Sequence, residues 1–238
     1  MTGDAFLRAE TLLGSAAMER LQQAHVAVFG LGGVGSWAAE ALVRGGIGTL
    51  TLVDFDCVSE TNLNRQLLAL HSTLGLPKAE VMAQRARDIN PGIDVRPFVM
   101  RYEAETRETL LSRDYDYILD AIDLVTCKLD LIQSAQALGI PILSCLGTGN
   151  RLSAEEFRIS DISKTRDDPL ARVVRKELRS RGIQHCQVLW APGEPRTPED
   201  TGETPPEGRR SIPGSVSWVP SAAGLMMAGH VIRTLCGA

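Results

Sequence analysis

Short apolar runs alternate with longer amphipathic stretches along most of this chain. The runs are typical of buried strands, and the longer stretches repeat apolar residues every three or four positions, as helices with one buried face do. The pattern predicts strands at residues 26–29, 49–53, 94–98, 115–119 and 141–144. It predicts helices at residues 11–23, 36–43, 78–90, 106–111 and 169–181. We therefore expect an α/β fold of the Rossmann-like, doubly wound kind, with a mostly parallel sheet and helices on both faces.

Residues 192–210 interrupt this alternation. The stretch is rich in proline and acidic residues and nearly free of apolar ones, so burial cannot repay the entropy of ordering it. We expect a mobile loop there, within a single domain over residues 1–238. The C-terminal segment 211–238 should pack on the core, with a buried helix from about residue 216.

The first apolar run leads into a glycine-rich turn, Gly30-Leu31-Gly32-Gly33-Val34-Gly35. A strand that turns through glycines into a helix aims backbone N–H groups and the positive end of the helix dipole at an anion. Tight packing of such a turn also requires glycines, so spacing alone leaves both interpretations open. The next strand ends at Asp54, about 20 residues further on, where a carboxylate can accept hydrogen bonds from ribose hydroxyls. The combination predicts a nucleotide site.

Polar and cationic side chains follow Asp54, namely Asp56, Asn62, Arg65, Gln66 and Lys78. A triphosphate carries about four charges against about two for a pyrophosphate, so it needs cationic side chains as well as backbone N–H groups. Arg65 offers a planar fork and Lys78 a mobile point charge. Either cation alone is better explained as a solvated surface residue. Together they favour ATP over a dinucleotide.

Two aspartates, Asp120 and Asp123, follow the strand at 115–119. Ligands of such sheets bind beyond the carboxyl ends of the strands, where Asp54 and Asp123 would both lie. A carboxylate there can hold the magnesium ion that bridges phosphate oxygens. We predict this role for Asp123, and a cap on the helix that follows it is a compatible alternative.

The overall charge gives no general attraction to nucleic acid, because 25 basic residues face 29 acidic ones. Any contact with RNA must come from a local patch. Residues 164–181 hold such an excess, and their basic side chains recur at helical spacing. Solvation is the commoner reason for a charged helical face, and tracking RNA phosphates is the alternative. The residues of this candidate RNA-binding face are Arg172, Arg175, Lys176 and Arg179.

The five cysteines are scattered and include no Cys-x-x-Cys pair. This usage indicates reduced intracellular thiols and predicts no zinc site. Cys186 follows His185, and a neighbouring histidine can lower the pKa of a thiol. Adjacent residues of a strand point to opposite faces, however, so an ordinary strand cysteine is the simpler interpretation.

Targeting signals are not evident in the sequence. Charged residues, Asp4, Arg8 and Glu10, occupy the place of a signal peptide's apolar region. The apolar stretch at 216–236 is marginal in length for a membrane span and is interrupted by Pro220 and Arg233. We expect a cytoplasmic protein without a membrane segment.

Together the glycine turn, Asp54, residues 62–66, Lys78 and residues 120–123 resemble the adenylating superfamily. That superfamily includes ubiquitin-activating enzymes and the bacterial activators of molybdopterin and thiamine sulfur carriers. Within it, the chain is similar to the tRNA threonylcarbamoyladenosine dehydratases. This closer likeness lies in residues 26–35, 169–173, 211–215 and 219–221.

The resemblance implies that the enzyme uses ATP to dehydrate threonylcarbamoyladenosine in tRNA, beside the anticodon, through an acyl adenylate. Arg65, Lys78 and Asp123 would then act on the triphosphate. A homodimer is also implied, in which Arg8 reaches the partner's triphosphate; a solvated helix-flanking cation is the alternative for Arg8. The substrate carries its own nucleophile, so no enzyme thiol is required.

Two other functions stay open at this point. An adenylyltransferase would activate the C-terminal glycine of a ubiquitin-like sulfur carrier and would involve a sulfur-transfer partner protein. A regulatory protein that holds ATP without chemistry would leave Arg65, Lys78 and Asp123 without a reason to converge. The resemblance also leaves open whether a monovalent cation binds.

Overall fold

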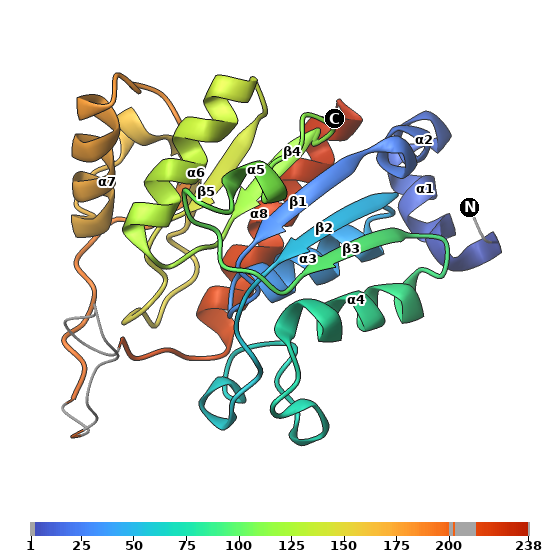
Figure 1. Ribbon diagram of the computed structural model, residues 1–238, viewed down its shortest axis with the longest axis horizontal. Helices are drawn as coiled ribbons and strands as arrows, with labels where there is room; N and C mark the ends of the chain where they lie inside the picture. Colours follow the sequence, from blue (N-terminus) through green and yellow to red (C-terminus); the bar gives the residue numbers. More distant parts are fainter. Residues whose placement is uncertain (1–2, 200–201, 203–212, 238) are drawn as a thin grey trace.

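Seven strands form one sheet in the computed structural model, which describes residues 3–199, 202 and 213–237. Their spatial order is β3-β2-β1-β4-β5-β7-β6 (Figure 1). The strands are β1 (His25–Phe29), β2 (Thr49–Val53), β3 (Asp94–Phe98), β4 (Tyr117–Asp120), β5 (Ile142–Cys145), β6 (Arg158–Asp161) and β7 (Gln187–Trp190). All neighbours pair in parallel except β6, which is antiparallel to β7. β1 lies between β2 and β4, so the strand order reverses beside it.

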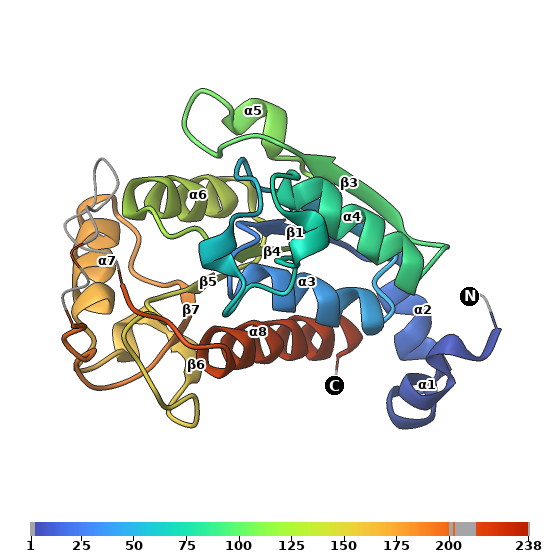
Figure 2. The ribbon, with the colours of Figure 1, turned by 90° about the horizontal axis from the view of Figure 1, so that it is seen from below.

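Helices cover both faces of this sheet (Figure 2). They are α2 (Ser15–Gln23), α3 (Gly35–Arg44), α4 (Lys78–Ile89), α5 (Arg107–Leu110), α6 (Val125–Leu138), α7 (Pro169–Ser180) and α8 (Trp218–Cys236). A further helix, α1 (Leu7–Leu13), packs on α2 and buries none of its residues. Alternate residues of β1 serve the two cores: Val26 and Val28 pack with α2, α3, α4 and α8, whereas Ala27 and Phe29 pack with α5, α6 and α7. A strand buried on both sides is apolar throughout, as the sequence pattern indicated.

The expected doubly wound α/β architecture is confirmed. The predictions for β2 and β3 agree residue for residue, and most others differ by one or two residues. The strand predicted at 115–119 is β4, which begins only at Tyr117; the Tyr115 ring packs edge-on against His25, and its hydroxyl donates to the Leu110 carbonyl. The pattern gave no range to β6, β7 or α6. β6 pairs only with β7 and its residues are exposed or half-buried, so it shows no buried apolar run.

The single helix predicted at 11–23 is wrong in its bounds, and its predicted apolar positions are buried only in part, since Ala17 and Leu21 are buried but Leu12 and Ala16 are not. Gly14 adopts a φ of 85°, which L-residues rarely tolerate, and it separates α1 from α2. Because the break changes the direction of the chain, Leu12 is 85% exposed and Ala16 is exposed, while Met18 is buried instead. One helical period therefore does not describe the whole segment.

The C-terminal helix α8 packs along α3, as expected for a buried helix. A Cβ atom on Gly224 would lie 2.2 Å from the Val34 carbonyl oxygen, so only glycine allows this approach. Within the described residues, no helix is long and apolar enough to cross a membrane.

Residues 192–199 form no helix or strand, and the Arg196 N–H donates to the Asn150 carbonyl at 2.8 Å. Most of the remaining expected loop, to residue 210, lies outside the described residues.

Candidate nucleotide site

Two glycines of the turn after β1 are required by packing. Gly30 has a φ of 88°, and a Cβ there would lie 2.7 Å from the Ala121 carbonyl oxygen. A Cβ on Gly35 would lie 1.8 Å from the Gly30 oxygen. These glycines let the turn close tightly against the loop after β4, which is a structural requirement independent of any ligand.

Of the other two glycines, Gly32 borders open space and Gly33 borders the N-terminal end of α8. A Cβ on Gly32 would meet no atom nearer than the Gln66 Nε2, at 3.8 Å. A Cβ on Gly33 would lie 3.1 Å from Pro220 and 3.5 Å from the Arg65 Cγ. A ligand can therefore approach the backbone at Gly32, beside the N-terminus of α3, where a helix favours an anion.

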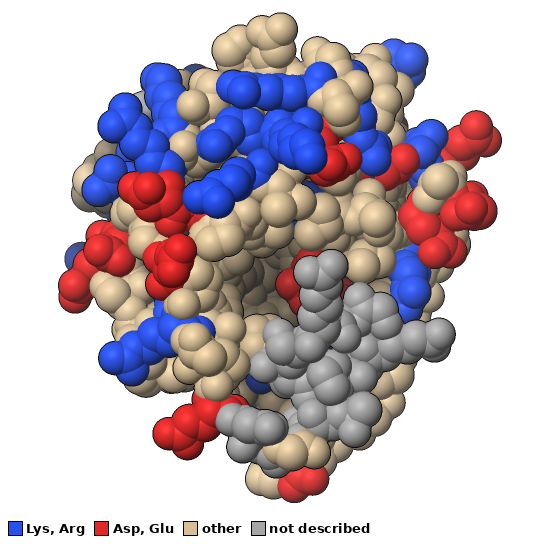
Figure 3. All heavy atoms as spheres, turned by 90° about the vertical axis from the view of Figure 1, so that its left-hand side faces the viewer, with Lys and Arg blue, Asp and Glu red and all other residues tan. Residues whose placement is uncertain are grey.

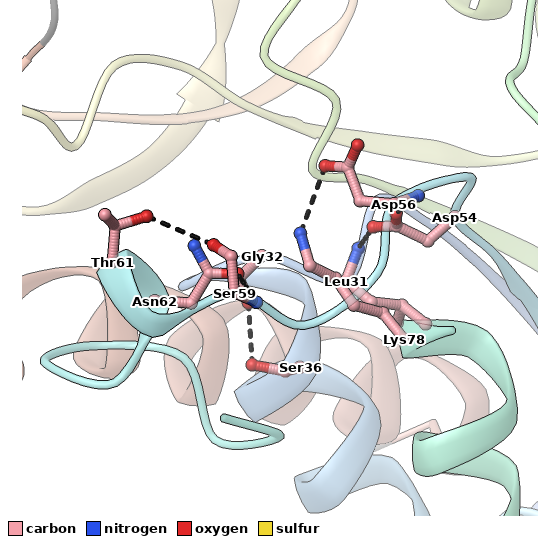
Figure 4. Close-up of polar contacts among 9 residues, drawn as sticks. All are labelled: Leu31, Gly32, Ser36, Asp54, Asp56, Ser59, Thr61, Asn62 and Lys78. Atoms are coloured by element: carbon pink, nitrogen blue, oxygen red, sulfur yellow. Dashed lines mark hydrogen bonds and ion pairs between the residues drawn. The ribbon is translucent and has the colours of Figure 1, made fainter. Parts of the chain in front are cut away.

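Asp54 joins the end of β2 to the glycine turn (Figure 4). Its Oδ2 accepts the Leu31 N–H at 2.6 Å, and its Oδ1 accepts the Asp56 N–H at 2.8 Å. Burial raises the pKa of this carboxyl, against the opposing effects of Lys78 and the two backbone donors. An ionised carboxylate accepts about four hydrogen bonds, so Asp54 keeps capacity for ribose hydroxyls.

Lys78 begins α4 and points toward Asp56 rather than into solvent (Figure 4). Its Nζ lies 3.1 Å from the Asp56 Oδ2, and the two side chains are 5% and 50% exposed. The interpretation of Lys78 as a solvated surface cation is therefore wrong. Asp56 holds the ammonium in place, and a phosphate with greater charge can compete for it.

The segment after β2 brings three more predicted residues to this edge. Asn62 uses its Oδ1 to accept the Ser59 N–H at 3.2 Å. The Arg65 guanidinium donates to the Thr61 carbonyl at 2.8 Å, and burial lowers its pKa while the charge of Asp123 opposes that shift. The buried Gln66 Oε1 has no hydrogen-bond partner among the described residues. Such an orphaned buried acceptor suits a site that a polar ligand completes.

Asp123 lies exposed in the turn between β4 and α6. Leu124, not Asp123, occupies the N-cap position of α6. The carboxyl ends of β1, β2 and β4 thus gather the glycine turn, Asp54, Asp56, Arg65, Gln66, Lys78 and Asp123 into one region. Arg8 is not part of this cluster and is exposed on α1.

One charged side chain at this edge was missed by the sequence analysis. Lys128 of α6 is buried and pairs with Asp120 at the end of β4. The only signal was a lysine on a helix that otherwise buries Leu129, Leu131 and Ile132. A solvated lysine is much the commoner case.

On the side of the molecule where α7 lies, Lys and Arg side chains gather along one rim of a hollow (Figure 1 and Figure 3). Arg172, Lys176 and Arg179 are exposed. Arg175 is half-buried and donates to the carbonyl and hydroxyl oxygens of Thr165, at 2.9 and 2.5 Å. The four predicted RNA contacts are therefore not equivalent.

A cavity of about 400 Å³ opens at the other end of the sheet, lined by Ser163, Arg179, Gln184 and His185. Cys186 follows the lining residue His185 in the sequence and precedes the amino end of β7. Burial raises the pKa of the Cys186 thiol to about 12, so almost none of it is thiolate at neutral pH. The His185 ring faces Asp161, with Nδ1 to Oδ2 at 3.3 Å. Neither the cavity nor this cysteine faces the glycine turn.

The chain belongs to the ThiF family, whose model matches residues 7–238. Within that family it belongs with the tRNA threonylcarbamoyladenosine dehydratases. The Bacillus subtilis protein of that name is 42% identical over 238 residues, which cover 97% of this chain and 94% of that protein. A Salmonella typhimurium molybdopterin-synthase adenylyltransferase is 36% identical over 126 residues, covering 53% of this chain and 50% of that protein.

Solved structures agree with this placement. The crystal structure of the Escherichia coli tRNA N6-threonylcarbamoyladenosine dehydratase TcdA in complex with AMP matches with a TM-score of 0.88 at 34% identity, covering 98% of this chain and 94% of that one. The ATP complex of the same protein matches with a TM-score of 0.85, covering 98% and 93%.

Proposed function

We propose that this protein binds ATP at the carboxyl edge of its sheet and uses it to dehydrate threonylcarbamoyladenosine beside the anticodon of tRNA. The observation that supports this most is the cluster around Gly32, where open space adjoins a helix N-terminus, the orphaned Gln66 oxygen and the charged side chains of Asp54, Arg65 and Lys78. The ATP and AMP complexes of the similar E. coli enzyme support the same nucleotide.

The reaction has two steps. An oxygen of the substrate's threonine carboxylate attacks the α-phosphorus of ATP, pyrophosphate leaves, and an acyl adenylate forms. The carbamoyl nitrogen of the same side chain then attacks the acyl carbon, loses its proton, and expels AMP. Because the nucleophile is tethered to the acyl group, its effective concentration is high. The protein has to position the groups and neutralise charge.

The residues divide this work by position. Asp54 accepts hydrogen bonds from the ribose hydroxyls, and the backbone of the glycine turn contacts the phosphates. Arg65 holds phosphate oxygens with its planar guanidinium. The Lys78 ammonium leaves its ion pair with Asp56 and binds a phosphate oxygen instead. Gln66 and Asn62 complete the polar wall.

Asp123 suits magnesium, which typically takes one or two protein carboxylates together with substrate phosphates and water. Its exposure at the strand end and the effect of its charge on Arg65 support that role. When bound, the metal neutralises the charge that develops on the leaving pyrophosphate. No group of three or more His, Cys, Asp or Glu side chains in the described part of the chain is placed to hold a metal by itself.

A homodimer would complete the site with a further cation. Arg8 is exposed on α1, so its guanidinium is available to a neighbouring subunit, as the family resemblance implies. In that arrangement it stabilises the triphosphate of the partner, much as an arginine finger does.

The tRNA would lie along α7. Arg172, Lys176 and Arg179 offer their charges to solvent and can neutralise RNA phosphates. Arg175 supports the helix through Thr165 and so contributes less to this contact. A cytoplasmic location, where ATP and tRNA are both available, fits this reaction.

Nucleoside analysis tests the reaction directly. A tRNA that carries uncyclised threonylcarbamoyladenosine is incubated with enzyme, ATP and magnesium. It is then digested to nucleosides, which are analysed by mass spectrometry. We expect the threonylcarbamoyladenosine peak to be replaced by one lighter by a water molecule, with one AMP released per product. An ATP analogue that cannot be cleaved between its α- and β-phosphates serves as the control. Unchanged nucleosides would contradict the proposal, and runs with and without potassium test a monovalent cation.

Activation of a ubiquitin-like sulfur carrier is the alternative, because the similar Salmonella protein is an adenylyltransferase. It predicts an acyl adenylate on a carrier C-terminus and a sulfur-transfer partner. A thioester version of that chemistry needs a thiolate near the nucleotide. Cys186, with its raised pKa and its place at the amino end of β7, is poorly suited to it.

A further inference from the structure

Three polar side chains with no assigned role lie buried where β4 and β5 end. The Lys128 Nζ is 2.7 Å from the Asp120 Oδ2 and donates to the Ser144 Oγ at 3.1 Å. The Ser144 hydroxyl donates to the same Asp120 oxygen at 2.6 Å. The Lys128 and Asp120 side chains are 2% and 0% exposed. This triad is a closed, charged network inside the sheet–helix interface.

Stability alone is a weak reason for such a network. Removing two charges from water costs more than a well-packed apolar pair would, and replacement of buried ion pairs by apolar residues is often neutral or stabilising. The surroundings of Lys128 on α6 are apolar, with Leu131 and Ile132 fully buried. An apolar residue would fit the helix pattern there, so the charges call for another explanation.

Asp120 connects the triad to the turn that carries Asp123. Its second oxygen, Oδ1, accepts the Ile122 N–H at 2.9 Å. On the other side of the turn, the Ala121 N–H donates to the Phe29 carbonyl at 2.8 Å, and the Ala121 carbonyl lies against Gly30. The backbone of residues 121–122 is therefore fixed from β1 and from Asp120 together. Asp123 is the next residue.

We propose that Lys128 is a positioning residue for the nucleotide site, acting through Asp120 on the turn that presents Asp123. Its ammonium and the Ser144 hydroxyl both donate to the Asp120 Oδ2, and together they fix the rotamer in which Oδ1 accepts the Ile122 N–H. Lys128 touches neither nucleotide nor metal, and this role rests on the proposed function of Asp123. Loss of the ammonium leaves the turn free to shift, so Asp123 is misplaced relative to the triphosphate.

Two variants test the proposal at different severity. Lys128→Met keeps the length of the side chain but leaves a buried carboxylate unpaired, so its stability must be measured. Ser144→Ala removes one donor to Asp120 while keeping the ion pair. The matched control is Asp130→Asn. Asp130 lies on α6, as Lys128 does, but its ion pair is with Arg107 of α5, away from the turn.

The measurements are AMP formation with tRNA, the magnesium concentration for half-maximal rate, and thermal unfolding. We expect kcat to fall about tenfold in Ser144→Ala and more in Lys128→Met, as for loss of a hydrogen bond to a charged group. The magnesium requirement should rise in both, with KM for tRNA unchanged. Asp130→Asn should lose stability yet keep the parent kcat and magnesium requirement.

The proposal is overturned if folded Ser144→Ala and Lys128→Met match the parent in kcat and magnesium dependence, or if Asp130→Asn shifts both as much. Should Lys128→Met fail to fold, Ser144→Ala alone decides. Should the parent leave tRNA nucleosides unchanged, the proposed function fails separately. The magnesium dependence of ATP binding, measured calorimetrically in the same variants, then decides the role of Lys128.

Discussion

The two edges of this sheet use polar side chains in opposite ways. At the amino edge, the His25 Nε2 lies 2.9 Å from the Thr51 hydroxyl, and the His25 N–H donates to Asp116 at 2.8 Å. These groups satisfy one another. At the carboxyl edge, the buried Gln66 oxygen lacks a partner among the described residues, and Asp123 is exposed. The first edge stabilises the fold, and the second keeps capacity for a ligand.

The strongest test of this contrast replaces one aspartate at each edge by alanine, in two separate variants. Asp123→Ala should lower AMP formation by about a hundredfold or more, as loss of a group that stabilises transition-state charge commonly does, with an unchanged fold by circular dichroism. Asp116→Ala should cost stability through the lost bond to His25 and leave kcat near the parent value. Parent-like turnover of Asp123→Ala at saturating magnesium would refute the site assignment.

Mixed dimers test whether the carboxyl edge is completed by a second subunit. Arg8→Ala and Asp123→Ala proteins should each be nearly inactive. In an equal mixture, half of the dimers combine both variants and regain one intact site of two, so about a quarter of the parent activity should return. The readout is AMP formation after subunit exchange has been verified. An absence of recovery would argue against Arg8 acting in trans.

Charge reversal on α7 separates substrate binding from nucleotide binding. The triple variant Arg172→Glu, Arg175→Glu, Arg179→Glu should weaken tRNA binding about tenfold or more and flatten its salt dependence, with ATP affinity unchanged. Arg175→Glu alone should mainly lower the unfolding temperature, because this arginine donates to Thr165. Titrations with labelled tRNA at several salt concentrations measure both. Retained tRNA affinity in the triple variant would exclude this face.

Cysteine replacement probes the amino edge, where we expect little effect on chemistry. Cys186→Ser, and replacement of all five cysteines by serine or alanine, should keep ATP-dependent cyclisation largely intact apart from modest packing losses. A thioester mechanism predicts instead that Cys186→Ser stops turnover and spares adenylation. A stable acyl thioester on Cys186, detected by mass spectrometry, would favour carrier activation.

The smallest expected effect concerns pH. Burial lowers the pKa of His25 below its usual 6.5, and burial does the same for His230. Because the unfolded chain then binds more protons, stability should be fully present above pH 6.5 and fall as the pH drops toward the lowered values. His25→Gln should lose part of this slope, measured by denaturant unfolding between pH 5 and 8. An unchanged slope would contradict a buried neutral His25.

The sequence predicted the nucleotide-binding edge better than it predicted the function of each residue within it. A strand, a glycine turn and an aspartate are local patterns, so β1, β2 and Asp54 were found. The division of the glycines into packing and open positions depends on Ala121 and Pro220, which are distant in the chain. The same holds for Arg175 and Thr165, and for Lys128 with Asp120, because tertiary pairing decides whether a charged residue is solvated or buried.

The placement of α8 bears on when this protein becomes functional during its synthesis. Pro220 lies against Gly33, and Gly224 lies against Val34, so the last helix walls one side of a turn formed by residues near the start of the chain. A nascent chain still lacking α8 has made the strands, Asp54 and Asp123 but leaves that wall open. The glycine turn should therefore be complete for a nucleotide only once α8 has docked against it.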